Sequence, residues 1–414
     1  MPRSCKVAII GAGVSGLTAA HELRREGHRV LVFEKSHRVG GIWVYDPRVE
    51  SDQLGRDPSR EIVHGSLYRS LRTNLPRHIM GFLDFPFTSR RDDGDSRTFP
   101  CHEEVLAFID DFAVEFQLLD LVRFGAEVMR VELGGVRKNE WVVEWRSAET
   151  EAKTESDVFE AVVVCNGHHT VPRIAEIQGA VLADGIEKWP GNQVHSHNYR
   201  TPEPFSDQIE SVFEDGKVLF HDGSAIKADV IFYCTGYNYH FPFLETNGIV
   251  SIDDNRVGPL YQHVFPPQLA PWLSFVGIAN KVIPFLTLEL QARWVAQVLS
   301  QRVMLPTEDE MLASVEEFYR RMDEARRPKH LTHHLHPFEV LVTVSFEYQN
   351  WLVAQLGLPP VEESMEQMYL AAIGNLIFHR DGFRDNWDDN YWINQSNSAV
   401  QKRENYGAKA GKIM

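Results

Sequence analysis

Short, continuous apolar runs recur along the chain, and each ends at glycine or at a polar cluster. This is the pattern of strands that are buried on both faces of a sheet. The first run, residues 6–10, leads into a glycine-rich turn and a helical stretch over residues 17–25, and residues 30–33 complete a βαβ unit. We expect further strands at residues 126–132, 140–146, 161–165, 229–233 and 272–277, and helices at 103–116, 285–301 and 307–327. This succession predicts an α/β fold built on a parallel sheet.

The turn after the first strand has the spacing G-x-G-x-x-G and reads Gly11-Ala12-Gly13-Val14-Ser15-Gly16. In a dinucleotide-binding turn the first glycine makes the tight bend, the second lets backbone approach a pyrophosphate, and the third lets helix and strand pack closely. The phosphates then lie at the helix N-terminus, where free N–H groups and the helix dipole favour negative charge.

A carboxylate follows the second strand at the distance that a dinucleotide fold requires. Glu34 lies 18 positions after Gly16, where it is expected to bind a ribose hydroxyl. A carboxylate there suits an unphosphorylated ribose and repels a 2′-phosphate, so the turn predicts FAD or NAD rather than NADPH. The alternative is a glycine turn in an ordinary βα unit.

The composition is that of an ordinary globular chain of 414 residues, with 43% apolar and 24% charged residues. A net charge of −16 argues against nucleic acid or an anionic membrane as the main partner. We expect no membrane span and no signal peptide, because no apolar run is long enough and the first one is the strand itself. The four scattered cysteines form no C-x-x-C pair, which indicates a reduced, cytoplasmic setting and excludes the flavin disulfide reductases.

After Glu34 and Lys35 the chain continues to Gly40-Gly41-Ile42-Trp43. A glycine pair lets a loop pass close to a ligand, and a tryptophan supplies a flat wall. With these residues the segment resembles the flavin-containing monooxygenases, which carry E-K-x-x-x-x-G-G-x-W. The likeness continues in the T-N-x-P core of residues 67–77, in residues 80–87, and in residues 189–199, where Trp189 replaces the phenylalanine of the fingerprint F-x-G-x-x-x-H-x-x-x-[YF]. It extends through residues 234–237, 258–267 and 289–291, and is nearest to the plant branch that oxygenates glucosinolate thioethers.

The resemblance implies a flavoprotein with two dinucleotide-binding domains, FAD in the first and NADPH in the second. It implies that residues 40–43 lie along FAD, that Asn74 lies beside the reactive edge of the flavin as the catalytic residue, and that Gly277 lies near the flavin. It further implies that NADPH reduces FAD and that O2 forms a C4a-hydroperoxyflavin, which oxygenates the sulfur of a small thioether or the nitrogen of an amine. The oligomeric state stays open.

Several of these residues have simpler interpretations. Asn74 could be a turn residue ahead of Pro76, and the aromatic residues of the fingerprint could serve packing alone. His195 and His197 have no third ligand at a suitable spacing, so we expect no metal site. We expect a solvated loop for the histidine group His330, His333, His334 and His336.

The family's second glycine turn is missing from the sequence. Only 28 residues separate Tyr199 from Ala228, which is fewer than the ~30 of a βαβ unit. The turn signals Asp215-Gly216 and Asp222-Gly223 already assign this stretch to short antiparallel strands. We therefore expect an internal deletion that removes the strand, phosphate turn and helix of the NADPH site.

The expected deletion determines the domain boundaries that we predict, and three functional classes remain possible. Residues 1–175 and 228–394 form the FAD-binding domain, residues 176–227 the remnant of the NADPH-binding domain, and residues 395–414 a polar tail. The chain is an active monooxygenase, an FAD-binding but catalytically impaired relative with at most weak oxidase activity, or a chain too damaged to hold FAD. For this polypeptide the residues favour the second class.

Overall fold

The computed structural model describes residues 3–87, 94–135, 137, 139–147, 154–174, 192–201, 217–219, 225–227, 230–335, 344–378, 382–389 and 391–392. Its central sheet has five strands in the order β17-β7-β1-β2-β3, and every neighbouring pair is parallel. The strands are β1 (Lys6–Ile10), β2 (Arg29–Phe33), β3 (Val122–Arg123), β7 (Ala161–Val164) and β17 (Leu273–Phe275).

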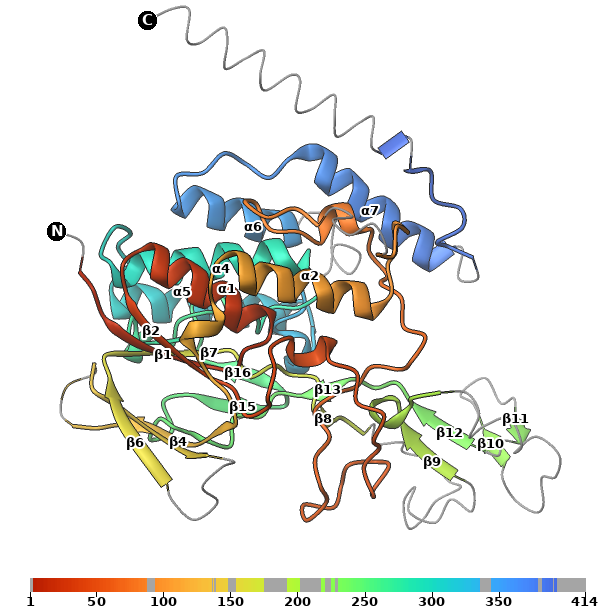
Figure 1. Cartoon of the computed structure of the whole chain (residues 1–414), viewed down its shortest axis with the longest axis horizontal. Coiled ribbons are helices and arrows are strands. Elements are labelled where there is room, and N and C mark those ends of the chain that lie inside the picture. Colours follow the sequence, from red (N-terminus) through yellow and green to blue (C-terminus); the bar gives the residue numbers. More distant parts are fainter. Residues whose placement is uncertain are drawn as a thin grey trace, which may run out of the picture.

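The two faces of this sheet are covered by different layers, as Figure 1 shows. Val7 and Ile9 of β1 belong to a core shared with the helices, whereas Ala8 and Ile10 pack with an antiparallel meander. Successive side chains of a strand point to opposite faces, so a continuous apolar strand fits between two layers. The α/β class expected from the sequence is confirmed.

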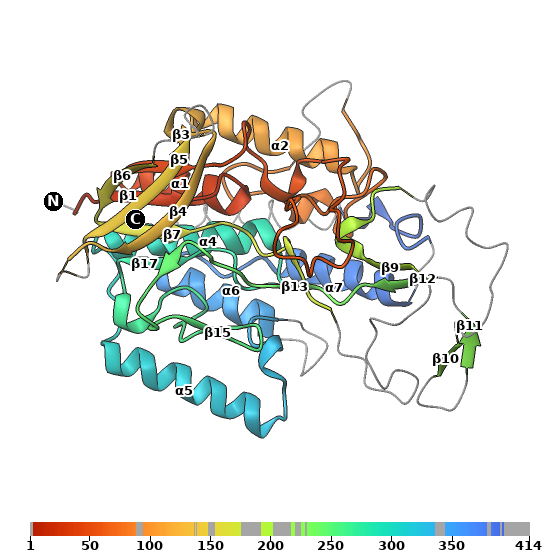
Figure 2. The ribbon, with the colours of Figure 1, turned by 90° about the horizontal axis from the view of Figure 1, so that it is seen from below.

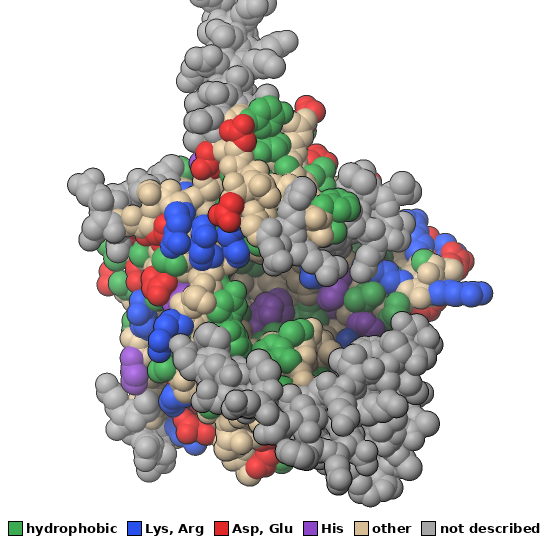
Figure 3. All heavy atoms as spheres, turned by 90° about the vertical axis from the view of Figure 1, so that its right-hand side faces the viewer, with side chains coloured by type: hydrophobic (Ala, Val, Ile, Leu, Met, Phe, Trp, Pro, Cys, Tyr) green, Lys and Arg blue, Asp and Glu red, His purple; other side chains and the backbone are tan. Residues whose placement is uncertain are grey.

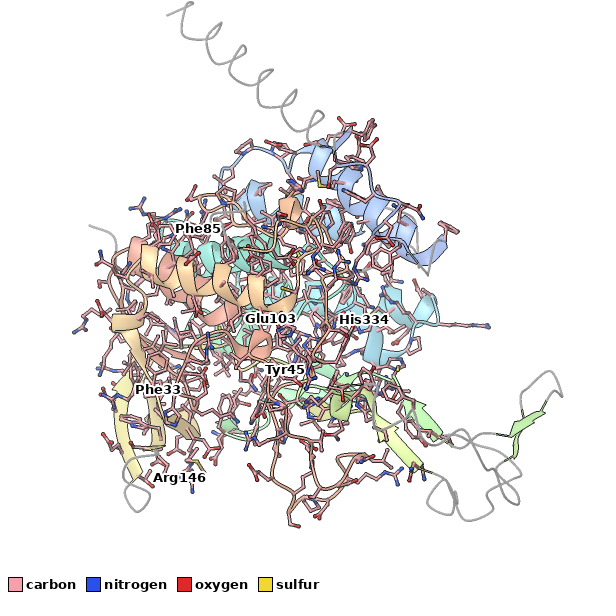
Figure 4. All side chains as sticks on the ribbon, turned by 45° about the vertical axis from the view of Figure 1, so that its right-hand side comes forward. Phe33, Tyr45, Phe85, Glu103, Arg146 and His334 are labelled. Atoms are coloured by element: carbon pink, nitrogen blue, oxygen red, sulfur yellow. The ribbon has the colours of Figure 1, made fainter. Side chains whose placement is uncertain are left out.

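One face carries helices and the other carries the meander. The helices are α1 (Val14–Arg25), α2 (His102–Glu115) and α4 (Pro284–Leu299), and the meander consists of β4 (Ala126–Leu133), β5 (Trp141–Ser147) and β6 (Thr154–Phe159), with β14 (Leu244–Glu245) beside β4. Figure 4 shows Phe33 on the meander side and Phe85 on the helix side. The ring of Phe33 lies 4.9 Å from that of Trp145.

The C-terminal third adds an outer helical layer and short loop elements. Its helices are α5 (Glu308–Glu324), α6 (Val344–Gln355) and α7 (Glu363–Phe378), and α6 packs on α4. Short 3-10 turns are η1 (Gly41–Trp43), η2 (Arg77–Ile79), η3 (Leu119–Leu121), η5 (Ser196–Asn198), η6 (Pro267–Leu269) and η7 (Lys329–Leu331), and a small hairpin joins β15 (Ser251–Asp253) to β16 (Arg256–Gly258). Of the helices that the structure describes, none is both long and apolar enough to cross a bilayer.

A smaller part of the chain lies outside both main sheets (Figure 2). Here β9 (Asn192–His195) pairs in parallel with β12 (Val230–Tyr233), and β10 (Lys217–Leu219) pairs antiparallel with β11 (Ala225–Lys227), as the turn signals predict. A third pair, β8 (Val171–Pro172) with β13 (Tyr237–Asn238), connects this part to the rest. Residues 175–191, 202–216 and the tail 395–414 lie outside the described residues, so the domain boundaries stay a prediction.

The parallel sheet brings three chain segments to one edge. Gly11 follows β1, Cys165 follows β7 and Gly277 follows β17, and β7 pairs with both other strands. Ligands of open α/β sheets bind at the carboxyl ends of the strands. We therefore expect a functional site at this edge of the sheet.

A buried ion cluster joins α1 to α4 behind that edge. The guanidinium of Arg293 donates to Glu22 Oε1 at 3.2 Å and to Glu289 Oε1 at 2.8 Å, and the other oxygen of Glu289 accepts from the N–H of Leu83 at 2.7 Å. Burial raises the pKa of both carboxyl groups against the pull of Arg293, and it raises that of Glu289 to about 7. Two buried carboxylates share the Arg293 cation here, with the exposed Asp84 3.5 Å from the same guanidinium and Arg25 3.3 Å from Glu22.

This cluster predicts a pH-dependent stability. The pKa of Glu289 is raised from 4.5 in the native protein, so the folded state holds this proton more tightly and loses stability as the pH rises from 4.5 through 7. We expect Glu289→Gln to reduce the fall in unfolding free energy between about pH 5 and 8 by roughly 1–3 kcal/mol in urea titrations. Glu316→Gln on the exposed face of α5 is the control. Identical pH profiles for the two variants would contradict the assignment.

Candidate functional site

The glycine turn after β1 brings backbone atoms closer together than a side chain would allow. Gly11 has a φ of 104°, and its N–H donates to the carbonyl of Phe33 at 2.8 Å. A Cβ on Gly11 would lie 2.6 Å from the carbonyl oxygen of Cys165, and one on Gly16 would lie 1.8 Å from the carbonyl oxygen of Gly11. Both positions therefore admit only glycine, which fits the tight turn and the close helix packing of a dinucleotide site.

Helix α1 begins directly on this turn with its N–H groups available. The first N–H groups of any helix have no partner within the helix. In the described part of the chain no side chain caps Gly13, and the first turn, Val14 to Gly16, holds no acidic residue. The N-terminus of α1 can therefore receive an anionic group.

Glu34 holds the turn from the end of β2. Its Oε2 accepts from the N–H of Ala12 at 2.8 Å, and its Oε1 accepts from the N–H and the hydroxyl of Ser36, each at 2.8 Å. The side chain is half-buried, whereas Lys35 beside it is exposed. The predicted ribose carboxylate thus lies in contact with the predicted phosphate turn.

The loop after β2 returns to the same turn. The N–H of Gly40 donates to the carbonyl of Ala12 at 3.1 Å. A Cβ on Gly41 would lie 2.9 Å from Gly13 Cα, so two glycine backbones face each other without side chains between them. Ile42 and Trp43 continue as the half-buried turn η1.

Gly277 approaches the turn from β17. Its φ is 97°, and a Cβ there would lie 2.7 Å from the Ser15 hydroxyl oxygen. Its N–H donates to Gln291 Oε1 at 3.0 Å, and the amide of Gln291 donates to the Tyr348 hydroxyl at 2.8 Å. A hydrogen-bond chain from α4 and α6 therefore fixes the position of this glycine.

The gathered groups fit a dinucleotide. They provide a helix N-terminus for a pyrophosphate, a carboxylate for a ribose, and glycine backbones that leave space for a ligand. The structure brings together residues 11–16, Glu34, residues 40–41 and Gly277. Their roles in binding FAD stay predictions.

Asn74 lies on a separate segment, with its side chain exposed. The N–H of Thr73 donates to the carbonyl of Pro100 at 2.9 Å, and the Thr73 hydroxyl donates to the carbonyl of Leu75 at 2.8 Å. The backbone on both sides of Asn74 is therefore fixed while its amide faces outward. Its catalytic role stays a prediction.

The fingerprint residues form a buried polar cluster with the loop after η1. His197 Nε2 lies 3.3 Å from Glu50 Oε1, and Glu50 Oε2 accepts from Arg60 at 2.6 Å. Burial opposes the charge of Glu50, but the bonds from His197 and Arg60 prevail and lower its pKa. Burial lowers the pKa of His195 to about 4, which leaves this ring neutral at physiological pH. His195 and His197 thus bind protein groups in this structure.

Arg200 directly follows the fingerprint, and every hydrogen bond of its buried guanidinium to a described residue goes to a backbone carbonyl. It donates to the carbonyl of Asp46 at 2.7 Å, of His197 at 2.6 Å and of Gly65 at 2.7 Å. A fourth bond, from the same nitrogen that donates to His197, reaches the carbonyl of Tyr199 at 3.1 Å. The fingerprint is therefore anchored to residues 46–65, which precede the expected deletion.

A group of aromatic rings beyond β7 was not predicted from the sequence. The rings of His168 and His169 lie 4.2 Å apart, His168 lies 5.2 Å from Tyr239, and His169 lies 5.3 Å from Tyr237. Figure 3 shows a hollow in one face of the molecule with histidine side chains in it. These rings could have been predicted from the sequence Gly167-His168-His169, which directly follows a buried strand. Residues in that position lie at the edge of a parallel sheet where ligands bind.

The solvated loop expected around the later histidines is wrong for His333. This residue is only 1% exposed, its Nε2 accepts from the N–H of Val257 at 3.1 Å, and its Nδ1 lies 3.0 Å from that of His263. Both partners are about 70 positions away in the sequence. His333 is therefore part of the core, whereas His330 and His334 are half-buried and His336 lies outside the described residues.

Comparisons with known proteins agree with this geometry. The sequence model of the flavin-binding monooxygenase-like family matches residues 4–213 and 207–334. Flavin-containing monooxygenase FMO GS-OX-like 1 of Arabidopsis thaliana is 43% identical over 453 aligned positions, which cover 95% of each protein. The structure of S-allyl-L-cysteine S-oxygenase from Allium sativum is 43% identical with a TM-score of 0.88, over 97% of this chain and 99% of that one. Tmm from Pelagibacter, 23% identical with a TM-score of 0.72 over 92% of each chain, shares the fold.

The alignment also shows that this chain is shortened. Its 453 positions include only 95% of 414 residues, about 393, so about 60 positions have no residue here. The family match divides into two segments that meet at residues 207–213, inside the stretch where the deletion was expected. A loss of this size exceeds the ~30 residues of a βαβ unit. The shortened chain is therefore shown, whereas the loss of the strand, phosphate turn and helix of the NADPH site stays a prediction.

The glycine contacts predict opposite effects for two alanine substitutions. Gly16→Ala places a methyl group 1.8 Å from a carbonyl oxygen, so we expect a loss of at least about 3 kcal/mol in unfolding free energy and little bound flavin. Gly374→Ala lies in α7, where nothing would lie within 4 Å of the new Cβ, and should gain up to about 1 kcal/mol. Urea unfolding and the visible absorption of the purified variants measure both effects. Equal stability of the two variants would contradict the packing argument.

Proposed function

Because the chain belongs to the flavin-binding monooxygenase-like family, we propose that it binds FAD, and the first candidate function is the transfer of one oxygen atom from O2 to the sulfur of a small thioether. One observation carries the choice of sulfur. The S-allyl-L-cysteine S-oxygenase of Allium sativum is 43% identical to this chain over nearly its whole length. A soft amine nitrogen is the alternative acceptor, and the free cysteines suit a cytoplasmic enzyme.

FAD fits the residues at the edge of the sheet. FAD supplies the redox chemistry when it is bound, and the protein supplies position and polarity. The N-terminus of α1 and the glycine turn would hold the pyrophosphate, and Glu34 would accept a bond from a ribose hydroxyl. Residues 40–43 and Gly277 would border the cofactor, and Asn74 would hydrogen-bond near its reactive edge.

A second candidate is an FAD-binding chain with little or no NADPH-driven turnover. The family uses NADPH as its electron donor, and the family match is interrupted at residues 207–213. We infer that the missing segment contains a strand, a phosphate-binding turn and a helix. Without them the protein has no binding site for the phosphates of NADPH. We favour this candidate, with peroxide as the product when the flavin is reduced by other means.

Anaerobic mixing distinguishes the two candidates. We expect the purified protein to be yellow, with about one FAD per chain, and its flavin to be bleached by dithionite but not by micromolar NADPH. A matched variant receives, at residues 207–213, the segment that FMO GS-OX-like 1 carries at this point, and its flavin should respond to NADPH. Fast, saturable bleaching of the original chain by micromolar NADPH would favour the active monooxygenase.

A further inference from the structure

Two carbonyl groups directly before Asn74 are held by one guanidinium from the far end of the chain. Arg384 donates from Nε to the carbonyl of Thr73 and from a terminal nitrogen to the carbonyl of Arg72, each at 3.0 Å. The guanidinium of arginine presents its N–H groups in a rigid planar fork, so one side chain can fix two acceptors at once. A lysine ammonium has no such fork.

The other contacts of the segment before Asn74 differ from those made by Arg384. A β-bridge joins Arg72 to Cys101, and Arg72 Nε donates to the carbonyl of Phe99 at 2.9 Å. These bonds hold the segment from one side, whereas Arg384 fixes the peptide groups that lead into Asn74. The orientation of those peptides sets the direction in which Asn74 leaves the backbone.

Residues 382–389 are firmly attached beside this segment. The ring of Phe99 lies 5.9 Å from that of Phe383 and 5.5 Å from that of Trp387, both edge to face. The Thr98 hydroxyl donates to Asp389, and the guanidinium of Arg384 lies 4.3 Å from the ring centre of Phe383. Arg384 is therefore half-buried on a packed aromatic support.

We propose that Arg384 is a positioning residue that aims the amide of Asn74 at bound flavin. The proposal rests on the proposed function, since it needs FAD in the site and Asn74 beside it. It makes Arg384, near the opposite end of the chain from the glycine turn, part of the machinery that controls how reduced flavin meets O2.

A double-mutant cycle on flavin reoxidation tests this proposal without NADPH. The flavin is reduced with dithionite and mixed with O2, and two electrons and two protons pass from reduced flavin to O2 to give hydrogen peroxide and oxidised flavin. We expect Arg384→Gln and Asn74→Ala each to change the reoxidation rate by about tenfold, and the double variant to equal Asn74→Ala. Arg384→Lys should behave like Arg384→Gln, and it replaces that variant if the latter loses FAD.

Asp389→Asn is the matched control, because it weakens the attachment of the same segment without touching the carbonyls before Asn74. It should keep the original rate. An additive effect of Arg384→Gln in the Asn74→Ala background, or an unchanged rate in Arg384→Gln with FAD bound, would overturn the positioning role alone. Purified protein without flavin would instead overturn the proposed function.

Discussion

The whole site depends on backbone groups that approach too closely for side chains to fit between them. Gly11 lies against the carbonyl of Cys165, Gly16 against Gly11, and Gly41 against Gly13. Together with the approach of Gly277 to Ser15, these contacts bring three strand ends, the start of α1 and the loop after β2 into one small region. The carboxylate of Glu34 then hydrogen-bonds to the backbone of the turn. Glycine at these positions is therefore a structural requirement from which the binding chemistry follows.

The fingerprint illustrates how a piece of a domain can be lost while its neighbours stay folded. Arg200 and His197 bind residues 46–65 of the first half of the chain, so their contacts do not involve the missing segment. The strands β9 and β12, which flank the deletion in sequence, pair directly with each other. We therefore expect the chain to retain the anchors of its second unit without that unit's phosphate turn. This separation explains why nearly every family motif is present in a chain that we expect to respond poorly to NADPH.

The sequence predicted the elements whose signals are local. The buried strands could be predicted because both faces of the sheet are covered, which requires continuous apolar runs. The glycine turn could be predicted because the spacing of its glycines follows from the backbone geometry of the turn. The buried state of His333 was not predictable, because Val257 and His263 reach it only through tertiary contacts. Arg384 was overlooked for the same reason, since an arginine near a polar terminus is typical of solvent exposure. Asn74 was found only through the family likeness, and among the described residues it has no partner that reveals a role.

The order of strands in the central sheet has a consequence for how the protein is made. The strand synthesised first, β1, occupies the middle of the sheet, and one of its neighbours, β7, pairs in turn with β17. During synthesis the apolar strand β1 therefore lacks its partner β7, and β7 lacks β17, until those strands leave the ribosome. Such non-local pairing is slow and exposes the chain to aggregation. Nascent chains of this protein should depend on chaperones until residue 275 has been translated.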